Sequence, residues 1–105
     1  MTHHDWKAVA WYLEGEGYFG FTGTTAHVTA GARDPEPIQR LFDLLGGSLR
    51  QQVRRSQIKP LFDFTVWWAT GERARQIMER VYPFMSRRRQ LQIQLALTHS
   101  ASRLD

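Results

Sequence analysis

Two carboxylates stand close together where a predicted helix ends. Glu14 and Glu16 alternate with Gly15 and Gly17, directly after the apolar segment Ala10–Leu13. A carboxylate is unfavourable at a helix C-terminus, because the negative end of the macrodipole lies there. Glycine lets the helix stop and lets the backbone approach another group closely. We therefore predict that an acid at this junction binds a divalent cation, since carboxylate oxygens are ligands that such cations prefer.

A simpler interpretation of the same residues stays open. Both acids can be ordinary solvated carboxylates, because a motif this short also occurs by chance. For Glu14 we favour a structural role, either pairing with a basic group or capping a helix. For Glu16 we favour the metal.

The distribution of basic residues indicates a polyanionic partner. The chain has 14 Lys and Arg against 10 Asp and Glu, a formal net charge of +4, and all but two of its basic residues are arginine. The stretch from residue 46 to residue 62 contains four basic residues and no acid, and Arg87–Arg89 forms a second cluster. Arginine binds phosphates and guanine edges in a bidentate manner. Nucleic acid is therefore favoured over a membrane surface as the partner.

Composition excludes several other classes. The 105 residues suit one domain spanning residues 1–105, and the absence of cysteine excludes disulfides and thiolate metal sites. No apolar run approaches the roughly 20 residues that a membrane span needs. We expect a cytoplasmic or nucleoid-associated protein, with a phage or an intron as a candidate source, no membrane partner and no small-molecule substrate.

Hydrophobic periodicity and punctuation by Gly and Pro predict eight elements. Asp5, Asp34 and Ser86 are candidate N-caps, and Gly46-Gly47 is a candidate helix end. Pro83 is expected to interrupt a helix. The predicted elements are a helix from 6 to 14, strands 18–24 and 26–32, a helix from 35 to 45, strands 48–55 and 61–69, a helix from 71 to 84, and a last helix after Ser86. In that last helix Leu91 and Leu95 are expected to be buried, with Ile93 as a further candidate.

This order predicts an α+β fold, αββαββαα, with a four-stranded antiparallel sheet and helices on one face. Trp68 is predicted to lie in the core and Trp67 on the opposite face, because neighbouring strand residues alternate. The open face is predicted to be polar and basic. Its expected residues are Tyr18, Thr22, His27, Thr29, Arg50, Gln52, Arg54, Asp63, Thr65 and Trp67.

Four passages together resemble the LAGLIDADG homing endonuclease family, in its single-motif, homodimeric form. The first has the form of the family signature, and the last is similar to the family's proline followed by a basic helix start. The passages are Val9–Gly17, Asp34–Gly47, Lys59–Trp67 and Val81–Gln90.

The resemblance implies a sequence-specific, metal-dependent endonuclease of double-stranded DNA. Two copies would place their signature helices side by side and form a saddle over a roughly palindromic site. Glu16 of each copy would hold Mg²⁺ near the scissile phosphate, beside Gly15, and Arg88 or Arg87 would stabilise the phosphate.

The resemblance and the predicted faces together give two sets of contact residues. The DNA-binding set is Thr22, Thr24, His27, Thr29, Arg33, Arg50, Gln52, Arg54, Arg55, Lys59 and Trp67. The dimer-interface set is Val9, Ala10, Trp11 and Leu13.

Three positions depart from the family pattern. Trp11 stands where a small residue normally lets two helices approach. Arg88 stands where a lysine is usual, and arginine does not release a proton at ordinary pH. Ala32 stands where a polar residue tends to organise water.

Two other functions therefore stay open beside the nuclease. One is a cleavage-deficient DNA-binding protein or transcriptional regulator with the same saddle. The other is a protein-interaction domain whose basic sheet meets an acidic protein. That domain would lack the steep salt dependence expected of DNA binding.

Overall fold

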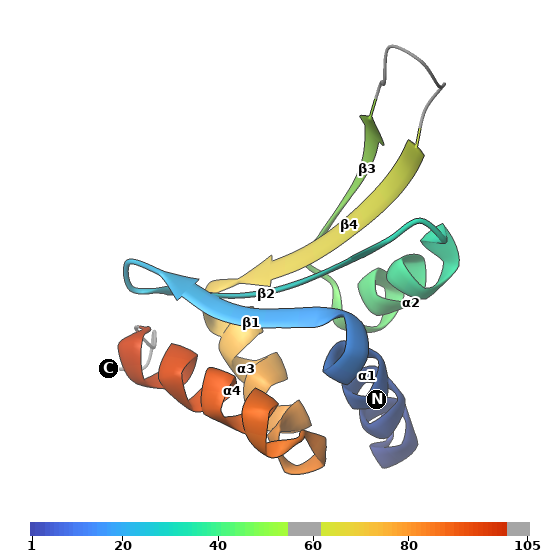
Figure 1. Cartoon of the computed structure of the whole chain (residues 1–105). Helices are drawn as coiled ribbons and strands as arrows, with labels where there is room; N and C mark the ends of the chain where they lie inside the picture. Colours follow the sequence, from blue (N-terminus) through green and yellow to red (C-terminus); the bar gives the residue numbers. More distant parts are fainter. Residues whose placement is uncertain (55–61, 101–105) are drawn as a thin grey trace.

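The computed structural model describes residues 1–54 and 62–100 and confirms the α+β fold and the order αββαββαα. Figure 1 shows the helices on one side of the sheet. The elements are α1 (His3–Glu16), β1 (Gly17–Thr22), β2 (Thr25–Ala32), α2 (Pro35–Leu45), β3 (Ser48–Arg54), β4 (Phe62–Thr70), α3 (Gly71–Val81), the 3-10 turn η1 (Tyr82–Phe84) and α4 (Arg87–His99).

The sheet is antiparallel throughout, with the strand order β1-β2-β4-β3. The two hairpins therefore meet through their second strands, β2 and β4. Ala30 of β2 lies opposite Gly17 on one side and Trp67 on the other. The β3–β4 hairpin extends beyond the helices (Figure 1). One face of the sheet is covered by helices, and the other is left open over all four strands.

The core forms where the helices meet the covered face. Trp67 is fully buried there, and its indole Nε1 donates a hydrogen bond of 2.7 Å to the carbonyl of Gly46 at the end of α2. Gly47 has a φ of +93°, and a Cβ at this position would lie 2.5 Å from the carbonyl oxygen of Trp68. Glycine is therefore required where α2 turns into β3.

The prediction for the faces of β4 was wrong. Trp67 and Thr65 are buried on the covered face, whereas Trp68 is half-buried on the open face. Asp63 takes a register position of the same parity as Thr65. The strand carries large apolar residues at both parities, so alternation alone could not choose between them. The small Ala30 opposite Trp67 and the carbonyl of Gly46 decide the choice, because they give the indole both space and a hydrogen-bond partner.

Two helix predictions also need correction. The N-cap of α1 is Thr2, and Asp5 completes a capping box, accepting from the Thr2 amide at 2.9 Å. These bonds from Thr2 lower the pKa of Asp5. In α4, Leu91 and Leu95 are exposed, and only Ile93, the further candidate, is buried. Apolar residues alternate along α4, and a helix can turn only one stripe of them inward.

The other punctuation signals were correct. Asp34 accepts a hydrogen bond of 3.0 Å from the amide of Glu36, with Pro35 at the first helical position of α2. Ser86 caps α4 by accepting from the amide of Arg89. Pro83 lies in η1, where the helix predicted up to residue 84 is broken. Among the described residues, no helix has the length and apolarity needed to cross a membrane.

Candidate nucleic-acid interface

The two acids at the end of α1 point in different directions. The helix ends at Glu16, and the amide of Gly17 donates to the carbonyl of Leu13 as β1 begins. Residues two positions apart in an α-helix point in directions that differ by roughly 200° around the helix axis. Glu14 and Glu16 therefore lie on different sides of α1, although only Gly15 separates them.

Glu14 is occupied by the start of α4. One carboxylate oxygen accepts from the amide of Ser86 at 2.5 Å, and the other accepts from the Ser86 hydroxyl at 2.9 Å. Arg89 Nε lies 3.6 Å from the second oxygen. The structural role expected for Glu14, with both pairing and capping, is thus confirmed. The Glu14 carboxylate is thus the anion that offsets the positive charge of the first turn of α4, and no external anion is needed there.

Arg89 completes this junction, and the sequence prediction missed its role. It is 6% exposed and donates to the carbonyl of Glu14 at 3.1 Å and to the side chain of Gln92 at 3.0 Å. Burial, and secondarily the charge of Arg88, lower its pKa, while Glu14 raises it. The signal was in the sequence, because Arg89, Ile93 and Ala96 are the buried stripe of α4 at spacings of four and three.

Glu16 lies on the surface, one helical turn after Tyr12. Burial is the main cause of a raised pKa for Tyr12, and the charges of Glu16 and Asp34 raise it further. The chain thus brings Glu16 and Asp34 to the same phenol. The sequence prediction treated Asp34 only as a helix cap and gave Tyr12 no role.

The end of α1 offers two oxygen donors of the kind that Mg²⁺ takes. Glu16 offers an exposed carboxylate, and Gly15 is exposed at the helix end, where backbone carbonyls lack intrahelical partners. Within residues 1–54 and 62–100, no group of three or more His, Cys, Asp or Glu residues can hold a metal. Mg²⁺ in proteins often takes one or two carboxylates and completes its shell with water and substrate phosphate. The oxygen donors are therefore suitable, but one copy supplies too few of them.

The open face collects much of the predicted DNA-binding set. Thr22, His27 and Thr29 share the face of Arg50, and Gln52 and Arg54 take register positions of the same parity as Arg50. Two more residues lie near strand ends, Thr24 in the β1–β2 turn and Arg33 after β2, and both are exposed. Trp67 does not belong to this face. Arg55 and Lys59 lie outside the described residues.

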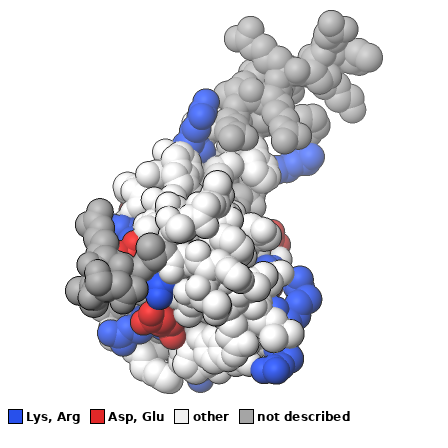
Figure 2. Space-filling view, turned by 90° about the vertical axis from the view of Figure 1, so that its left-hand side faces the viewer, with Lys and Arg blue, Asp and Glu red and all other residues white. Residues whose placement is uncertain are grey.

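The open face is also less polar than the sequence predicts it to be. Its middle strand, β4, carries the half-buried side chains of Phe64, Val66 and Trp68. On β1 and β2, Tyr18 stacks on His27 with ring centroids 5.9 Å apart. Figure 2 shows basic side chains on both flanks of the upper molecule, where Figure 1 places the β3–β4 hairpin, above a broad uncharged surface. The face thus combines a basic margin with an aromatic middle, which is typical of nucleic-acid contact.

Gly20 makes the Tyr18–His27 stack possible. A Cβ at this position would lie 2.7 Å from the Tyr18 ring and 2.8 Å from the His27 ring. No real side chain tolerates such distances unless one of the rings moves away. The stack also leaves His27 Nδ1 buried without a hydrogen-bond partner among the described residues.

Arg87 and Arg88 are exposed in the first turn of α4, beside the Glu14 junction. Of the four residues expected at a dimer interface, only Trp11 is on the surface. Val9, Ala10 and Leu13 are buried in the core of the single chain. They face inward because the helix must cover the sheet, so the interface expected from the sequence is reduced to the opposite side of α1.

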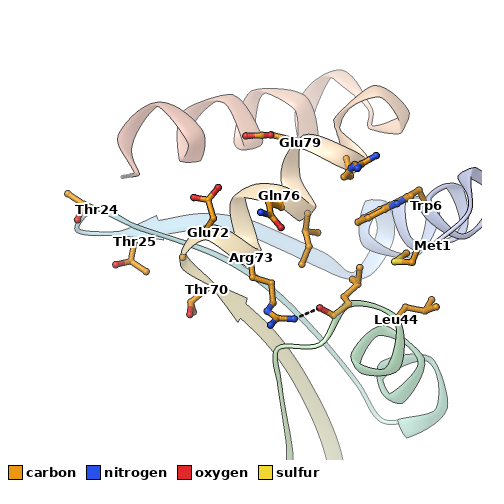
Figure 3. Close-up of a pocket in the computed structure, with 14 residues that line it drawn as sticks. Met1, Trp6, Thr24, Thr25, Leu44, Thr70, Glu72, Arg73, Gln76 and Glu79 are labelled. Atoms are coloured by element: carbon orange, nitrogen blue, oxygen red, sulfur yellow. Dashed lines mark hydrogen bonds between the residues drawn. The ribbon is translucent and has the colours of Figure 1, made fainter. Parts of the chain in front are cut away.

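A large hollow lies on the helix side of the sheet. Its volume is about 1240 Å³, and it lies between α1, α2 and α3 (Figure 3). Arg73 crosses it and donates to the carbonyl of Leu45 at 2.8 Å, holding α3 to the end of α2. Glu72, Glu79 and Arg80 also line it. The hollow contains none of the residues predicted to bind DNA except Thr24.

Comparison with known proteins finds no family model that matches the chain and no curated protein that matches it. Any function assigned to the chain therefore depends on the geometry of its own residues.

Proposed function

We propose that two copies of this chain form a LAGLIDADG-like, sequence-specific endonuclease that hydrolyses double-stranded DNA with Mg²⁺. The observation that carries the proposal is the difference between the two acids at the end of α1. Glu14 is tied to Ser86 and Arg89, whereas Glu16 is exposed where the helix enters the sheet. An acid with no structural duty at that position is the ligand that the chemistry requires.

The number of carboxylates supports a homodimer. Each copy offers Glu16 as a metal ligand, and a duplex has two phosphodiester bonds to cut. Two copies related by a two-fold axis supply one acid for each strand, on a roughly palindromic site. Bound Mg²⁺ would lower the pKa of its water and neutralise charge on the phosphate. Arg87 and Arg88, exposed beside the Glu14 junction, would add positive charge for the DNA backbone on that side of α1.

The open face supports duplex DNA as the partner. β3 is an edge strand of the sheet, and Arg50, Gln52 and Arg54 take register positions of one parity along it. These groups read base edges in the major groove. Thr22 and Thr29 add hydroxyls for phosphates or bases, and Val66 and Trp68 add apolar surface for thymine methyls or sugars.

A second function is favoured by two positions at which the chain departs from the pattern of the family it resembles. Ala32 ends β2 without a polar group, and Arg88 cannot act as a base. A DNA-binding protein or regulator that does not cut would keep the same face and need no metal.

One experiment separates the two functions. The protein is incubated with a randomised duplex library, first with Mg²⁺ and then with Ca²⁺, and both the cut and the retained DNA are sequenced. The nuclease is expected to cut one near-palindromic sequence with Mg²⁺ and to retain the same sequence with Ca²⁺.

Variants sharpen this test. Glu16→Gln should reduce cutting by at least ~100-fold and leave retention unchanged, as expected when a metal site is lost. Glu79→Gln, which changes an exposed acid on α3, is the matched control and should cut normally. Retention without cutting would favour the regulator. Absence of retention, or retention that does not fall steeply as salt rises, would overturn both functions.

A further inference from the structure

We propose that Trp11 of each copy packs into the groove between α1 and α2 of the other copy. The proposal rests on the homodimer of the proposed function and adds how its two copies recognise each other. The groove has a volume of about 300 Å³. Its apolar walls come from both helices, and they are Ala8, Val9 and Tyr12 on α1 and Pro37, Leu41 and Leu44 on α2.

Trp11 is an apolar side chain without an apolar environment. It is 86% exposed, more than any other large hydrophobic residue in the described part of the chain. An indole is among the side chains that contribute most when an interface buries them. Trp11 also stands on the rim of the groove, so the projection and the recess belong to one patch.

A patch that holds both a projection and a recess is what a two-fold interface requires. In such an interface the same surface is used by both partners, so each copy must offer what the other accepts. The groove is large enough to admit an indole ring. A partner of another kind would explain the groove or the tryptophan, whereas a second copy explains both.

The charges around the groove also fit a second copy of the same surface. Asp34 and Glu36 stand on its margin near the start of α2, and Arg40 stands one turn further along the same helix. A two-fold rotation can bring the basic part of one rim to the acidic part of the other. The polar rim therefore fits self-association as well as the apolar walls do.

The small residues beside Trp11 leave room for the partner helix. Ala8 and Gly15 are exposed on the same side of α1, three residues before and four residues after Trp11. A Cβ added at Gly15 would meet nothing within 4 Å. The indole therefore enters the groove to one side, and the two α1 helices need not approach through Trp11 itself.

The arrangement also brings the Glu16 of a second copy into the same assembly. Glu16 follows Trp11 by five residues, which is about 7.5 Å along the helix axis. Five residues also turn the helix by about 140°, so Glu16 lies at the margin of a contact anchored at Trp11 and not within it. The acid of the second copy is then supplied by the same helix that makes the contact.

Sedimentation velocity of the full chain over a range of concentrations tests the proposal. The wild-type chain is expected to be a dimer at micromolar concentration, and Trp11→Lys should weaken the dimer by at least ~100-fold. Leu95→Lys is the matched control, because Leu95 is 54% exposed on α4, away from the groove, and it should leave the dimer intact. Far-UV circular dichroism and the melting temperature check that each variant folds.

A second variant tests the same interface by filling the groove instead of removing Trp11. Ala8→Trp fills the groove from within its own copy and should also give monomers, although Trp11 is unchanged. If both variants stay dimeric, the proposal is wrong, and continued cutting by them would leave the nuclease standing. A wild-type chain that is monomeric even on its cut DNA would also overturn the proposal. A wild-type dimer that neither retains nor cuts DNA would overturn the proposed function and leave the Trp11 contact standing.

Discussion

The two sides of α1 differ in how completely the chain itself satisfies them. On the side that meets α4, the Glu14 carboxylate has partners on both oxygens, and Arg89 fills the remaining space. On the side that meets α2, Trp11 is exposed beside a groove and Glu16 ends the helix at the surface. One helix therefore holds the fold together with one side and leaves the other exposed at the surface.

Two neighbouring tryptophans of β4 show the same contrast between a side chain satisfied inside the protein and one left at the surface. Trp67 is buried with its indole nitrogen bonded, whereas its neighbour Trp68 stands half-buried on the open face. Neighbouring residues of one type thus have different duties, because a strand turns successive side chains to opposite faces. Whether a residue stabilises the fold or stays exposed depends on the direction of its side chain more than on its position in the sequence.

The largest expected effect separates the two tryptophans. Trp67→Ala should destabilise the protein by about 3–5 kcal/mol, because it empties a packed site and leaves the Gly46 carbonyl without its donor. Trp68→Ala, the matched control, should cost about 1–2 kcal/mol, since its indole is only partly covered. Urea unfolding followed by circular dichroism measures both values. Equal costs would mean that the two side chains do not differ in burial as described.

The next effect separates two arginines of the α4 start. Arg89→Met should destabilise by about 2–3 kcal/mol, because Glu14 loses a cation and its carbonyl loses a donor. Arg88→Met, at an exposed position, should stay within about 0.5 kcal/mol of the wild type. Thermal unfolding of the two variants side by side gives the comparison. A stable Arg89→Met variant would show that the buried junction does not hold α1 to α4.

A smaller effect separates the two acids. Glu14→Gln should destabilise by about 1–2 kcal/mol, because charge-assisted hydrogen bonds to Ser86 become weaker neutral ones. Glu16→Gln should change stability by less than about 0.5 kcal/mol, as for an ordinary surface residue. Chemical unfolding at neutral pH measures the difference. If Glu16→Gln were the more destabilising change, Glu16 would have a structural duty and the proposed metal role would lose its basis.

The smallest effect appears only in alkali. The raised pKa of Tyr12 means that the folded state keeps the phenol proton longer than the unfolded state does. Folding stability from this group is therefore complete below the unfolded pKa of about 10 and is lost as pH rises through the higher folded value. Tyr12→Phe should match the wild type at pH 7 and lose less stability above about pH 10.

Unfolding measured at several alkaline pH values, with absorbance at 295 nm for phenolate formation, checks this prediction. Parallel stability curves for the wild type and Tyr12→Phe above about pH 10 would contradict it. They would mean that Tyr12 is no harder to ionise in the folded chain than in the unfolded one.

Much of the fold followed from local signals. Asp34 before Pro35, Gly46-Gly47 and Ser86 each act through hydrogen bonds or backbone angles within a few residues, so their positions alone located helix ends. The structural role of Glu14 was also expected, although its partner 72 residues away was not. Trp68 was wrongly placed inside because it was judged by parity without a register.

The sequence by itself determined the order of helices and strands, the places where they end, the basic character of the chain and the presence of an acidic pair at the end of α1. These features depend on propensity, periodicity and composition, which act over short distances. Only the tertiary structure decided that Glu14 closes onto α4, that Trp67 is the inner tryptophan and that Trp11 stands beside a groove. The reason is physical, because each of these outcomes depends on a strand register or a helix contact between segments far apart in the chain.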